Sequence, residues 1–406
     1  SYRIFFGSKD QVNISTSLTK NQELFKKLES GGDQKLTDYL ALSKFQYQTA
    51  MAKFIYKDYR NLLDFADWQL LSQAPKLKLF NSLHLLVSKY FQNPKLQKIL
   101  EYSTVFLGSS PYNTPALYGL MSHIDFNLGV WYPLGGLGQV VLALQKLAQD
   151  QNVKILTNHE VNHLQINQGK VTSVICSHEQ VFKADIVVSS ADYQFSETRL
   201  LSKNYQTYPQ SYWQKKIMAP STFLIFLGLN KKIKALTHHN LILQPNWHQH
   251  FSQIFDTPAW PDKPSLYLSC PSKTDPSVAP AGKENIFVLV PVAPGLTDTP
   301  KQRDSYEKHI FELIQQYIGE AINQDVVLKK TYAHQDFVQD YHAYQGSALG
   351  LAHTLWQTAL FRPAHHSRKV ANLFYTGAYT HPGIGVPMVL IAAEIVAHSI
   401  NNMYAP

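Results

Sequence analysis

Residues 372–397 constrain the fold more than any other stretch of the sequence. They read NLFYTGAYTHPGIGVPMVLIAAEIVA: a short apolar strand ends at Gly377, a loop holds Gly383 and Gly385, and Pro387 fits the first turn of a helix. The glycines let a backbone approach a ligand closely, and the helix N-terminus offers free N–H groups to an anion. The helix is apolar almost all round, which predicts that it is buried. A ligand site and a plain buried strand–loop–helix both remain open on these residues.

The rest of the chain alternates strand and helix patterns. Residues 1–20 predict a strand hairpin, and residues 21–127 have helical spacing broken at glycines and prolines. A Gln-Gly turn at 168–169 between alternating runs marks a second hairpin. The stretch GVWYPLGG (129–136) predicts a short strand and a glycine turn, followed by a helix over 138–149 and a strand over 153–157, a βαβ-like unit. Further predicted elements are strands at 221–229, 239–244, 265–270 and 285–292, and helices at 301–322 and 346–360.

Composition excludes several classes of protein. The 406 residues are 45% hydrophobic and 16% charged, which excludes a disordered, collagen-like or coiled-coil chain. Two cysteines, Cys176 and Cys270, cannot form a disulfide framework in a chain of this length, so we expect a reducing compartment. The N-terminus lacks the pattern of a signal peptide. No apolar run reaches the roughly 18 residues of a membrane span, so we expect that the chain does not cross a bilayer.

Positive charge is concentrated in one segment. Residues 68–100 contain five lysines and no acidic residue, interleaved with leucines and aromatics. This pattern is typical of a helix that lies on a membrane, with Lys76, Lys78 and Lys89 as contacts to the headgroups. An ordinary helical cap with a solvated basic face is the alternative, and this segment alone favours it. No motif supports nucleic-acid binding.

The signatures of several catalytic chemistries are absent from the sequence. It contains no GxxxxGK[ST], CxxC, HExxH or GxSxG pattern. Its histidines, which include pairs at 238–239 and 365–366, lack carboxylates or further histidines at ligand spacing. We therefore expect surface histidines and no metal site.

Several segments together resemble one protein family. In order along the chain they are GVWYPLGG, TNHEV (157–161), VVSSADY (187–193), STFLIFLGLN (221–230), YQGSALGLAHTLWQTALFRP (344–363) and the C-terminal stretch. They resemble the bacterial-type phytoene desaturases, the carotenoid desaturase branch of the flavin amine oxidase superfamily. The combination covers essentially the whole chain and is specific, although each segment alone would be weak.

The resemblance implies an α/β, FAD-dependent, two-dinucleotide-binding fold of the glutathione-reductase or amine-oxidase type. It has a mixed-sheet substrate domain and a helical membrane-facing region. Residues 1–20 would be a hairpin of the substrate domain, 21–127 the membrane-facing helices, 128–192 part of the FAD-binding domain, 193–345 the substrate domain, and 346–406 the return to the FAD-binding domain. The family's opening Rossmann βαβ unit with GxGxxG is missing from these residues. A fragment, which Ser1 in place of an initiator Met favours, and a lost cofactor site both explain this.

The resemblance also implies individual site residues. FAD would contact Val161 and Ala191 at its adenosine end, Gly377 near the pyrophosphate, and Gly383, Gly385, Val386, Pro387 and Met388 around the isoalloxazine. Candidates for the substrate tunnel or the flavin face are Phe126, Trp131, Tyr132 and Tyr379, although plain core positions are the alternative. His381 is a candidate proton acceptor, and capping of the loop is its alternative role.

The implied reaction is the desaturation of a carotenoid polyene in carotenoid biosynthesis. Flavin N5 accepts a hydride from an allylic carbon while the neighbouring carbon loses a proton, so the protein mainly positions the polyene and excludes water. The alternatives are a polyene isomerase or saturase, a dehydrosqualene desaturase, a soluble flavin amine oxidase and an inactive fragment. The expected partners are a lipophilic polyene and a membrane surface, and the expected location is the cytoplasm, peripherally on the membrane.

Overall fold

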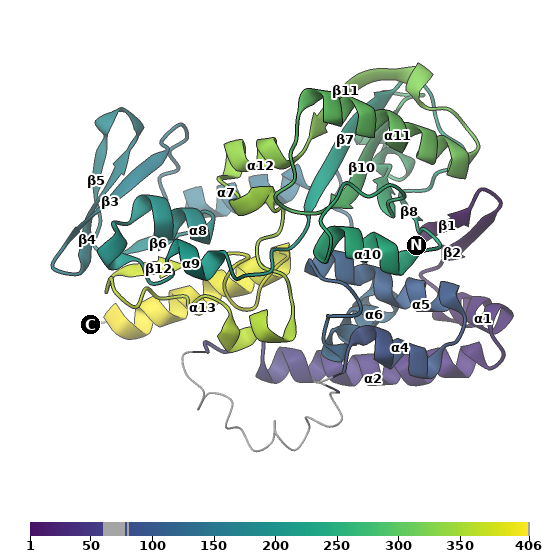
Figure 1. The fold of residues 1–406 in the computed structure, drawn as a ribbon, viewed down its shortest axis with the longest axis horizontal. Coiled ribbons are helices and arrows are strands. Elements are labelled where there is room, and N and C mark those ends of the chain that lie inside the picture. Colours follow the sequence, from purple (N-terminus) through teal and green to yellow (C-terminus); the bar gives the residue numbers. More distant parts are fainter. Residues whose placement is uncertain (60–77, 79–80, 405–406) are drawn as a thin grey trace.

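The structure, a computed structural model, describes residues 1–59, 78 and 81–404. Two lobes lie side by side (Figure 1). The lobe predicted to bind substrate holds a seven-stranded sheet, with helix α11 (Pro300–Ile318) on one face and N-terminal helices on the other. The second lobe holds two small sheets and the C-terminal helix α13 (Val386–Tyr404).

The seven-stranded sheet has the order β11-β7-β10-β9-β8-β1-β2. Its strands are β1 (Tyr2–Gly7), β2 (Asp10–Ile14), β7 (Ser221–Leu229), β8 (His239–Ile242), β9 (Leu266–Ser269), β10 (Glu284–Val292) and β11 (Val326–Tyr332). The predicted N-terminal hairpin and the four strands predicted between 221 and 292 are confirmed. Strand β11 was not predicted, because the sequence VVLKKTY leaves most of its residues exposed and shows no clear alternation.

Helix α11 shows how local sequence sets the ends of an element. The Thr299 hydroxyl accepts a hydrogen bond from the backbone N–H of Gln302, Pro300 occupies the first turn, and Gly319 ends the helix with φ 74°. The buried face of the helix packs on inward residues of the sheet such as Ile225 and Val288. This cluster is the largest apolar core in the described part of the chain.

The N-terminal helices form a layer on the opposite sheet face. They are α1 (Leu18–Leu28), α2 (Gly32–Lys53), α4 (Leu83–Tyr90), α5 (Pro94–Glu101) and α6 (Leu120–His123), and α10 (Trp247–Phe255) joins them. Phe25 lies at the centre, edge-on to Phe91 with ring centroids 5.5 Å apart and to Phe126 at 6.1 Å. Most apolar residues of α4 and α5, including Leu86 and Leu96, are buried in this core, while Leu85 is 55% exposed. The buried side chains face the sheet, so they do not contribute to a membrane-facing surface.

The second lobe combines segments from both halves of the chain. Strands β3 (Val161–Asn167), β4 (Lys170–Cys176) and β5 (Val181–Lys183) form one sheet, and the predicted Gln-Gly turn between β3 and β4 is confirmed. Strand β6 (Val187–Ser189) pairs in parallel with β12 (Leu373–Tyr375), so residues 187 and 373 are neighbours. Short helices α8 (Tyr193–Phe195), α9 (Gln210–Trp213) and α12 (His334–Tyr341) surround this pair (Figure 1).

Three predicted elements differ in the structure. Helix α7 (Gly138–Asp150) forms as predicted, but it has no buried residue. Its flanks at 129–133 and 153–157 are not strands, because no described strand lies beside them to accept their hydrogen bonds. The helix predicted at 346–360 is instead a loop with 3₁₀ turns, Leu355–Gln357 and Ala359–Phe361.

The C-terminal helix is buried on one side only. Ile391, Ala392, Ile395 and Val396 pack inward, while Val386 is 61% exposed, so the prediction of a buried helix is wrong for the other face. By length and apolar composition alone, α13 qualifies as a membrane span, and it is the one helix among the described residues that does so.

Candidate functional site

The carboxyl ends of β6 and β12 meet at a cavity of about 410 Å³. Parallel strands of open α/β sheets bind ligands at this edge. Ala191 and Gly377 are brought together here: a Cβ on Gly377, whose φ is 117°, would lie 3.9 Å from the Ser190 carbonyl oxygen. The buried Thr376 hydroxyl, next to Gly377, has no hydrogen-bond partner among the described residues. A polar ligand at this edge would supply one.

A buried arginine holds the loop that follows β12. The Arg362 guanidinium is 4% exposed and donates hydrogen bonds to three consecutive loop carbonyls, those of Ala378 at 2.6 Å, Tyr379 at 3.2 Å and Thr380 at 3.1 Å. Its other donors reach the carbonyls of Gln357 and Leu351. Burial lowers the pKa of Arg362 to about 10, so the group remains charged at neutral pH. The sequence analysis missed this residue, because neighbouring residues in the sequence do not show that it is buried.

The two loop glycines have different neighbours. A Cβ on Gly383, whose φ is 122°, would lie 2.3 Å from His353 Nε2 and 3.3 Å from the guanidinium carbon of Arg362. Gly385 has a φ of 114°, but its nearest contact would be Met388 Cγ at 4.0 Å. Gly383 is therefore required by the protein's own packing. Gly385 is exposed beside the start of α13, as are Val386 and Pro387, while Met388 is half-buried.

His381 belongs to the same loop, between Gly377 and Gly383. Its Nε2 donates to the carbonyls of Phe54 at 2.9 Å and Ile55 at 3.1 Å, at the end of α2. Burial lowers the pKa of His381 to about 4, so the ring is neutral. The other nitrogen, Nδ1, is buried without a partner among the described residues. His381 thus joins the loop to α2, and its role as a proton acceptor stays a prediction.

Val161 and Tyr379 are placed in different surroundings. Val161 pairs with Cys176 across the β3–β4 hairpin and packs at the margin of the second lobe's core. Tyr379 is 8% exposed and donates a 2.5 Å hydrogen bond to Asp192 Oδ2, which also accepts from the Tyr344 N–H. Tyr379 therefore lies at the strand-end cavity and not in an apolar tunnel.

A larger cavity of about 580 Å³ lies in the lobe of the seven-stranded sheet, beside the loop that begins at Gly129. Phe126 and Trp131, two of the predicted tunnel residues, line it. Tyr132, the third, instead stacks edge-on against His238 with ring centroids 4.7 Å apart. The remaining lining is mostly apolar and includes Ile14, Met121, Ile124, Leu128, Val130 and Leu241. We call this space the main cavity.

One carboxyl group lies in the wall of the main cavity. Asp125 Oδ2 accepts hydrogen bonds from the hydroxyls of Tyr2 at 2.7 Å and Tyr102 at 3.1 Å. Burial raises the pKa of Asp125, although these two hydroxyls act in the opposite direction. The sequence analysis missed this group, since its tyrosine partners are distant in sequence.

Other predicted surface features are placed as follows. Lys78 and Lys89 are exposed, and Lys76 lies outside the described residues. Seven histidines are buried, so the expectation that the histidines lie on the surface is wrong for them: His123, His238, His250, His334, His353, His365 and His381. No group of three or more His, Cys, Asp or Glu side chains that could hold a metal occurs among the residues that the structure describes. Both cysteines are free and buried.

Residues 5–401 match the protein-family model described as "Flavin containing amine oxidoreductase". The chain belongs to this flavin-dependent oxidoreductase family. FAD is accordingly its cofactor. A Cβ at Gly377 or Gly385 would meet nothing closer than 3.9 Å, so the backbone at these two positions after β12 is open to a ligand.

The similar curated proteins are carotenoid desaturases. A carotenoid 3,4-desaturase of Haloarcula japonica is 43% identical over 98% of this chain and 81% of its own length. A zeta-carotene-forming phytoene desaturase of Myxococcus xanthus is 29% identical over 98% of this chain and 77% of its own. The family member thus falls in the carotenoid desaturase branch, as the sequence segments predicted.

Solved structures show the same fold at low identity. An oxidoreductase from Methanosarcina mazei matches with a TM-score of 0.58 and 18% identity, over 89% of this chain and 75% of that one. A putrescine oxidase bound to putrescine matches with a TM-score of 0.57 and 10% identity, over 100% of this chain and 81% of that one. These likenesses confirm an amine-oxidase-type fold with a mixed sheet.

Proposed function

We propose that this family member is an FAD-dependent carotenoid desaturase and that its polyene substrate occupies the main cavity. The observation that carries the proposal is a largely apolar cavity of about 580 Å³ beside the loop at 129–131, in a chain 43% identical to a carotenoid 3,4-desaturase. A cavity whose lining surface is mostly apolar, although Ser15, Thr16, Ser103, Asn127 and His239 contribute to it, suits a substrate that has no charged group for the protein to hold.

Flavin supplies the redox step, since it accepts a hydride when bound. The chain's own residues do the positioning. Arg362 fixes the carbonyls of residues 378–380, and the close packing of Gly383 on His353 holds the following turn toward Gly385. Phe126 and Trp131 line the main cavity, and their apolar surfaces would orient the polyene; Phe126 is buried, while Trp131 is 89% exposed.

A soluble flavin amine oxidase is the principal alternative. An amine substrate needs a polar or acidic group in a compact site, because a protonated amine is costly to bury unpaired. The main cavity offers one carboxyl group, Asp125, and both of its neighbouring tyrosine hydroxyls already donate to it. The apolar lining therefore favours a polyene. A polyene isomerase or saturase and a dehydrosqualene desaturase would use a similar cavity, and product analysis separates them.

We infer that the second lobe packs against a dinucleotide-binding βαβ unit that these 406 residues do not contain. The sequence holds no GxGxxG to bind the pyrophosphate. Helix α7 exposes Val141, Leu142, Leu144 and Leu147, and α13 exposes Val386 and Leu390. Among the described strands, β6 pairs only with β12, so its other edge is open, whereas residues 365–367 cover the other edge of β12 through backbone hydrogen bonds. The open edge of β6 and the exposed apolar helix faces are the surfaces that such a unit would cover.

The decisive measurement is the visible absorption spectrum of the purified 406-residue chain. We expect no stoichiometric flavin band, poor solubility and no desaturation, because the pyrophosphate-binding half is absent and apolar surface is exposed. Fusion of a family-type βαβ unit ahead of Ser1 is expected to restore flavin binding and conversion of an acyclic carotenoid. A stoichiometric flavin band without that unit would refute the inference that the unit supplies half of the FAD site. A yellow fused protein that oxidises amines but no polyene would refute the proposed desaturase activity.

We also propose that the chain docks peripherally on the cytoplasmic face of a membrane, where its lipophilic substrate resides. The support is local: Lys78 and Lys89 are exposed, and Leu85 on α4 is 55% exposed beside them in sequence. Two other lysines of the basic segment are used internally, because Lys95 pairs with Asp10 and Lys98 donates to backbone carbonyls. The proposed contact is therefore smaller than the whole basic segment.

A further inference from the structure

His239 presents an imidazole ring to the main cavity. It lies on β8 two residues before Leu241, so both side chains are on one face of the sheet, and both line the main cavity. Nδ1 of His239 is 2.6 Å from the hydroxyl oxygen of Tyr267. Nε2 has no hydrogen-bond partner among the described residues, and it is not one of their buried unpaired atoms. This nitrogen is therefore the one that His239 can offer to an occupant of the cavity.

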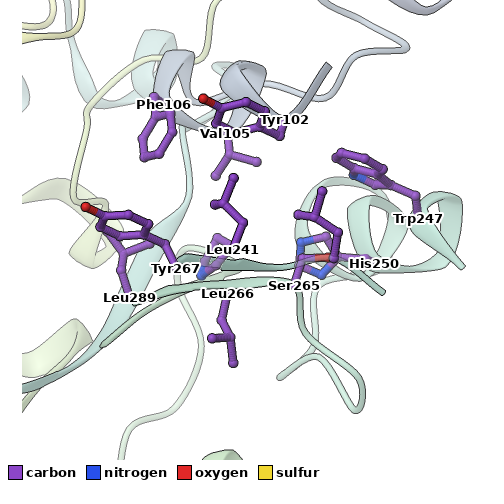
Figure 2. A pocket seen from close by; sticks show the side chains of 12 residues that line it. Tyr102, Val105, Phe106, Leu241, Trp247, His250, Ser265, Leu266, Tyr267 and Leu289 are labelled. Carbon is purple, nitrogen blue, oxygen red and sulfur yellow. The ribbon is translucent and has the colours of Figure 1, made fainter. Parts of the chain in front are cut away.

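Tyr267 holds the ring of His239 in place. It lies on β9, which pairs with β8, and it lines the main cavity as well. Its ring is edge-on to that of Phe106, with centroids 6.4 Å apart. Figure 2 shows Phe106 and Tyr102 on one side of a small apolar space and Tyr267 and Leu241 on the other. Because these contacts fix the phenol ring, its hydroxyl stays within hydrogen-bond reach of Nδ1.

The imidazole of His239 is neutral near pH 7. Burial and the neighbouring His238, whose ring centroid is 4.1 Å away, lower the pKa of His239 to about 4. A neutral imidazole has one N–H and one lone pair. With the proton on Nδ1, donated to the Tyr267 oxygen, the lone pair is on Nε2 and open to the main cavity.

Desaturation needs a proton acceptor beside the polyene. One hydrogen leaves the substrate as a hydride to the flavin, and the resulting positive charge is shared by the conjugated carbons. A hydrogen on the adjacent carbon is then strongly acidic, so the acceptor needs a free lone pair within reach more than it needs a high pKa. A neutral imidazole that is held by one nitrogen and free at the other meets this requirement.

We propose that His239 accepts the proton that leaves the polyene during desaturation, with Tyr267 as its positioning residue. The proposal rests on the desaturase function and on the place of the polyene proposed above. As the hydride leaves one carbon, the C–H bond of the adjacent carbon breaks, its proton passes to Nε2 of His239, and its electron pair becomes the new π bond. Burial disfavours the charged ring, so the proton then passes to water at the side of the cavity where Trp131 is 89% exposed.

Two other groups are weaker candidates for this role. His381 does not line the main cavity, and its Nε2 already donates to the carbonyls of Phe54 and Ile55. Asp125 does line the cavity, but its Oδ2 accepts from two tyrosine hydroxyls, which hold the carboxyl group in the wall. Asp125 is therefore the acceptor against which His239 is tested.

The first test measures access to Nε2 without turnover. Diethyl pyrocarbonate acylates neutral imidazoles, and mass spectrometry of the digested protein shows which histidines have reacted. In the fused, flavin-containing protein we expect His239 to react and a partly saturated acyclic carotenoid in detergent micelles to protect it. His248, which is exposed on α10, is the matched control and should react equally with and without the carotenoid.

The second test measures the proton step itself. His239→Gln keeps a hydrogen-bonding side chain but has no basic lone pair, so we expect desaturation to slow by about 100-fold or more while the dissociation constant of the carotenoid is unchanged. Deuterium at the carbon that loses the proton should slow this variant more than it slows the unaltered protein, because proton removal has become the slow step. A purely structural defect would not raise this isotope effect. His248→Gln is the control for both the rate and the isotope effect.

Tyr267→Phe tests the positioning of the ring. Without the hydroxyl, the proton of His239 is no longer held on Nδ1, so nitrogen NMR of labelled protein should show Nε2 as a mixture of N–H and lone-pair forms. The rate should fall less than in His239→Gln. An unchanged tautomer in this variant would remove Tyr267 from the proposal.

The outcomes separate this inference from the proposed function. A His239 that does not react, or that reacts equally when the carotenoid is bound, would overturn the inference, as would an unchanged rate and isotope effect in His239→Gln. A raised isotope effect in Asp125→Asn instead would assign the proton to the carboxyl group. Each of these results leaves desaturation by the fused protein standing, whereas failure of the carotenoid to bind would overturn the proposed function and the inference together. His239→Asn carries the same comparison where the glutamine variant does not fold.

Discussion

Replacing the two loop glycines by alanine should destabilise the chain to different extents. Both have a φ that L-residues rarely adopt, 122° at Gly383 and 114° at Gly385. Only Gly383 is also in contact with other side chains: the new Cβ would lie 2.3 Å from His353 Nε2 and 2.6 Å from its Cε1. The comparison therefore separates backbone strain from steric overlap.

The magnitude follows from these contacts. Strain in such a backbone region costs about 1–3 kcal/mol, and both variants carry it. At Gly383 the imidazole must also move by roughly 1 Å to reach ordinary contact distance, although it is 2% exposed and donates to the Leu107 carbonyl. Overpacking of this kind adds about 1–3 kcal/mol. We expect Gly383→Ala to lose about 2–6 kcal/mol of unfolding free energy, and Gly385→Ala about 1–3 kcal/mol.

The assay is urea unfolding of the fused protein, followed by tryptophan fluorescence. Adding His353→Ala to Gly383→Ala removes the two atoms in collision, so the double variant should recover part of the loss despite the cavity left behind. Gly385→Val should lower flavin occupancy while the fold persists. Equal losses in the two alanine variants, or no recovery in the double variant, would refute the steric reasoning.

Three further predictions concern charged groups. Burial favours the neutral form of Asp298, but Arg303 at 2.6 Å holds the pKa of this carboxyl below its ordinary value. The ion pair therefore stabilises the fold fully above pH 3.8, and this stabilisation is lost as the pH falls through the lowered pKa. Asp298→Ala should cost about 3–5 kcal/mol of unfolding free energy at pH 7, measured by urea titration. Arg362→Met should lower the midpoint of thermal unfolding and flavin occupancy together, because five backbone carbonyls lose their donor, and a flavin content equal to that of the unaltered protein would contradict its positioning role. Charge reversal of both Lys78 and Lys89 should weaken binding to anionic vesicles by about 2 kcal/mol or more, since each lysine near the surface contributes about 1 kcal/mol. Flotation assays should show the loss most clearly at low salt, and unchanged binding would count against this docking surface.

Elements with local signals could be predicted from the sequence. The strands β7 and β10 follow from long apolar runs, and the Gln-Gly turn between β3 and β4 follows from its flanking alternation. The strand–loop–helix at the C-terminus follows from its glycines and Pro387. In these places the residue types alone restrict the backbone to one arrangement.

Groups whose partners are distant in sequence could not be predicted. Arg362 acts through the carbonyls of a loop 16 or more residues away, and Asp125 is held by Tyr2, 123 residues away. The burial of His250 depends on the neighbouring strands and not on its own helix. The flanks of α7 carry apolar residues as predicted, but a strand forms only where a neighbour accepts its hydrogen bonds.

The pairing of β6 with β12 has a consequence for synthesis of the chain. Residue 187 acquires its parallel neighbour only when residue 373 has been made, and five strands of the seven-stranded sheet, β7 to β11, are translated in between. Contacts at such sequence separation form late, since the loop between them must close first. Until then the β3–β6 segment and the apolar side of α7 remain open to association with other chains. The β3–β6 segment therefore completes its backbone pairing only when residues 373–375, close to the C-terminus, have emerged from the ribosome.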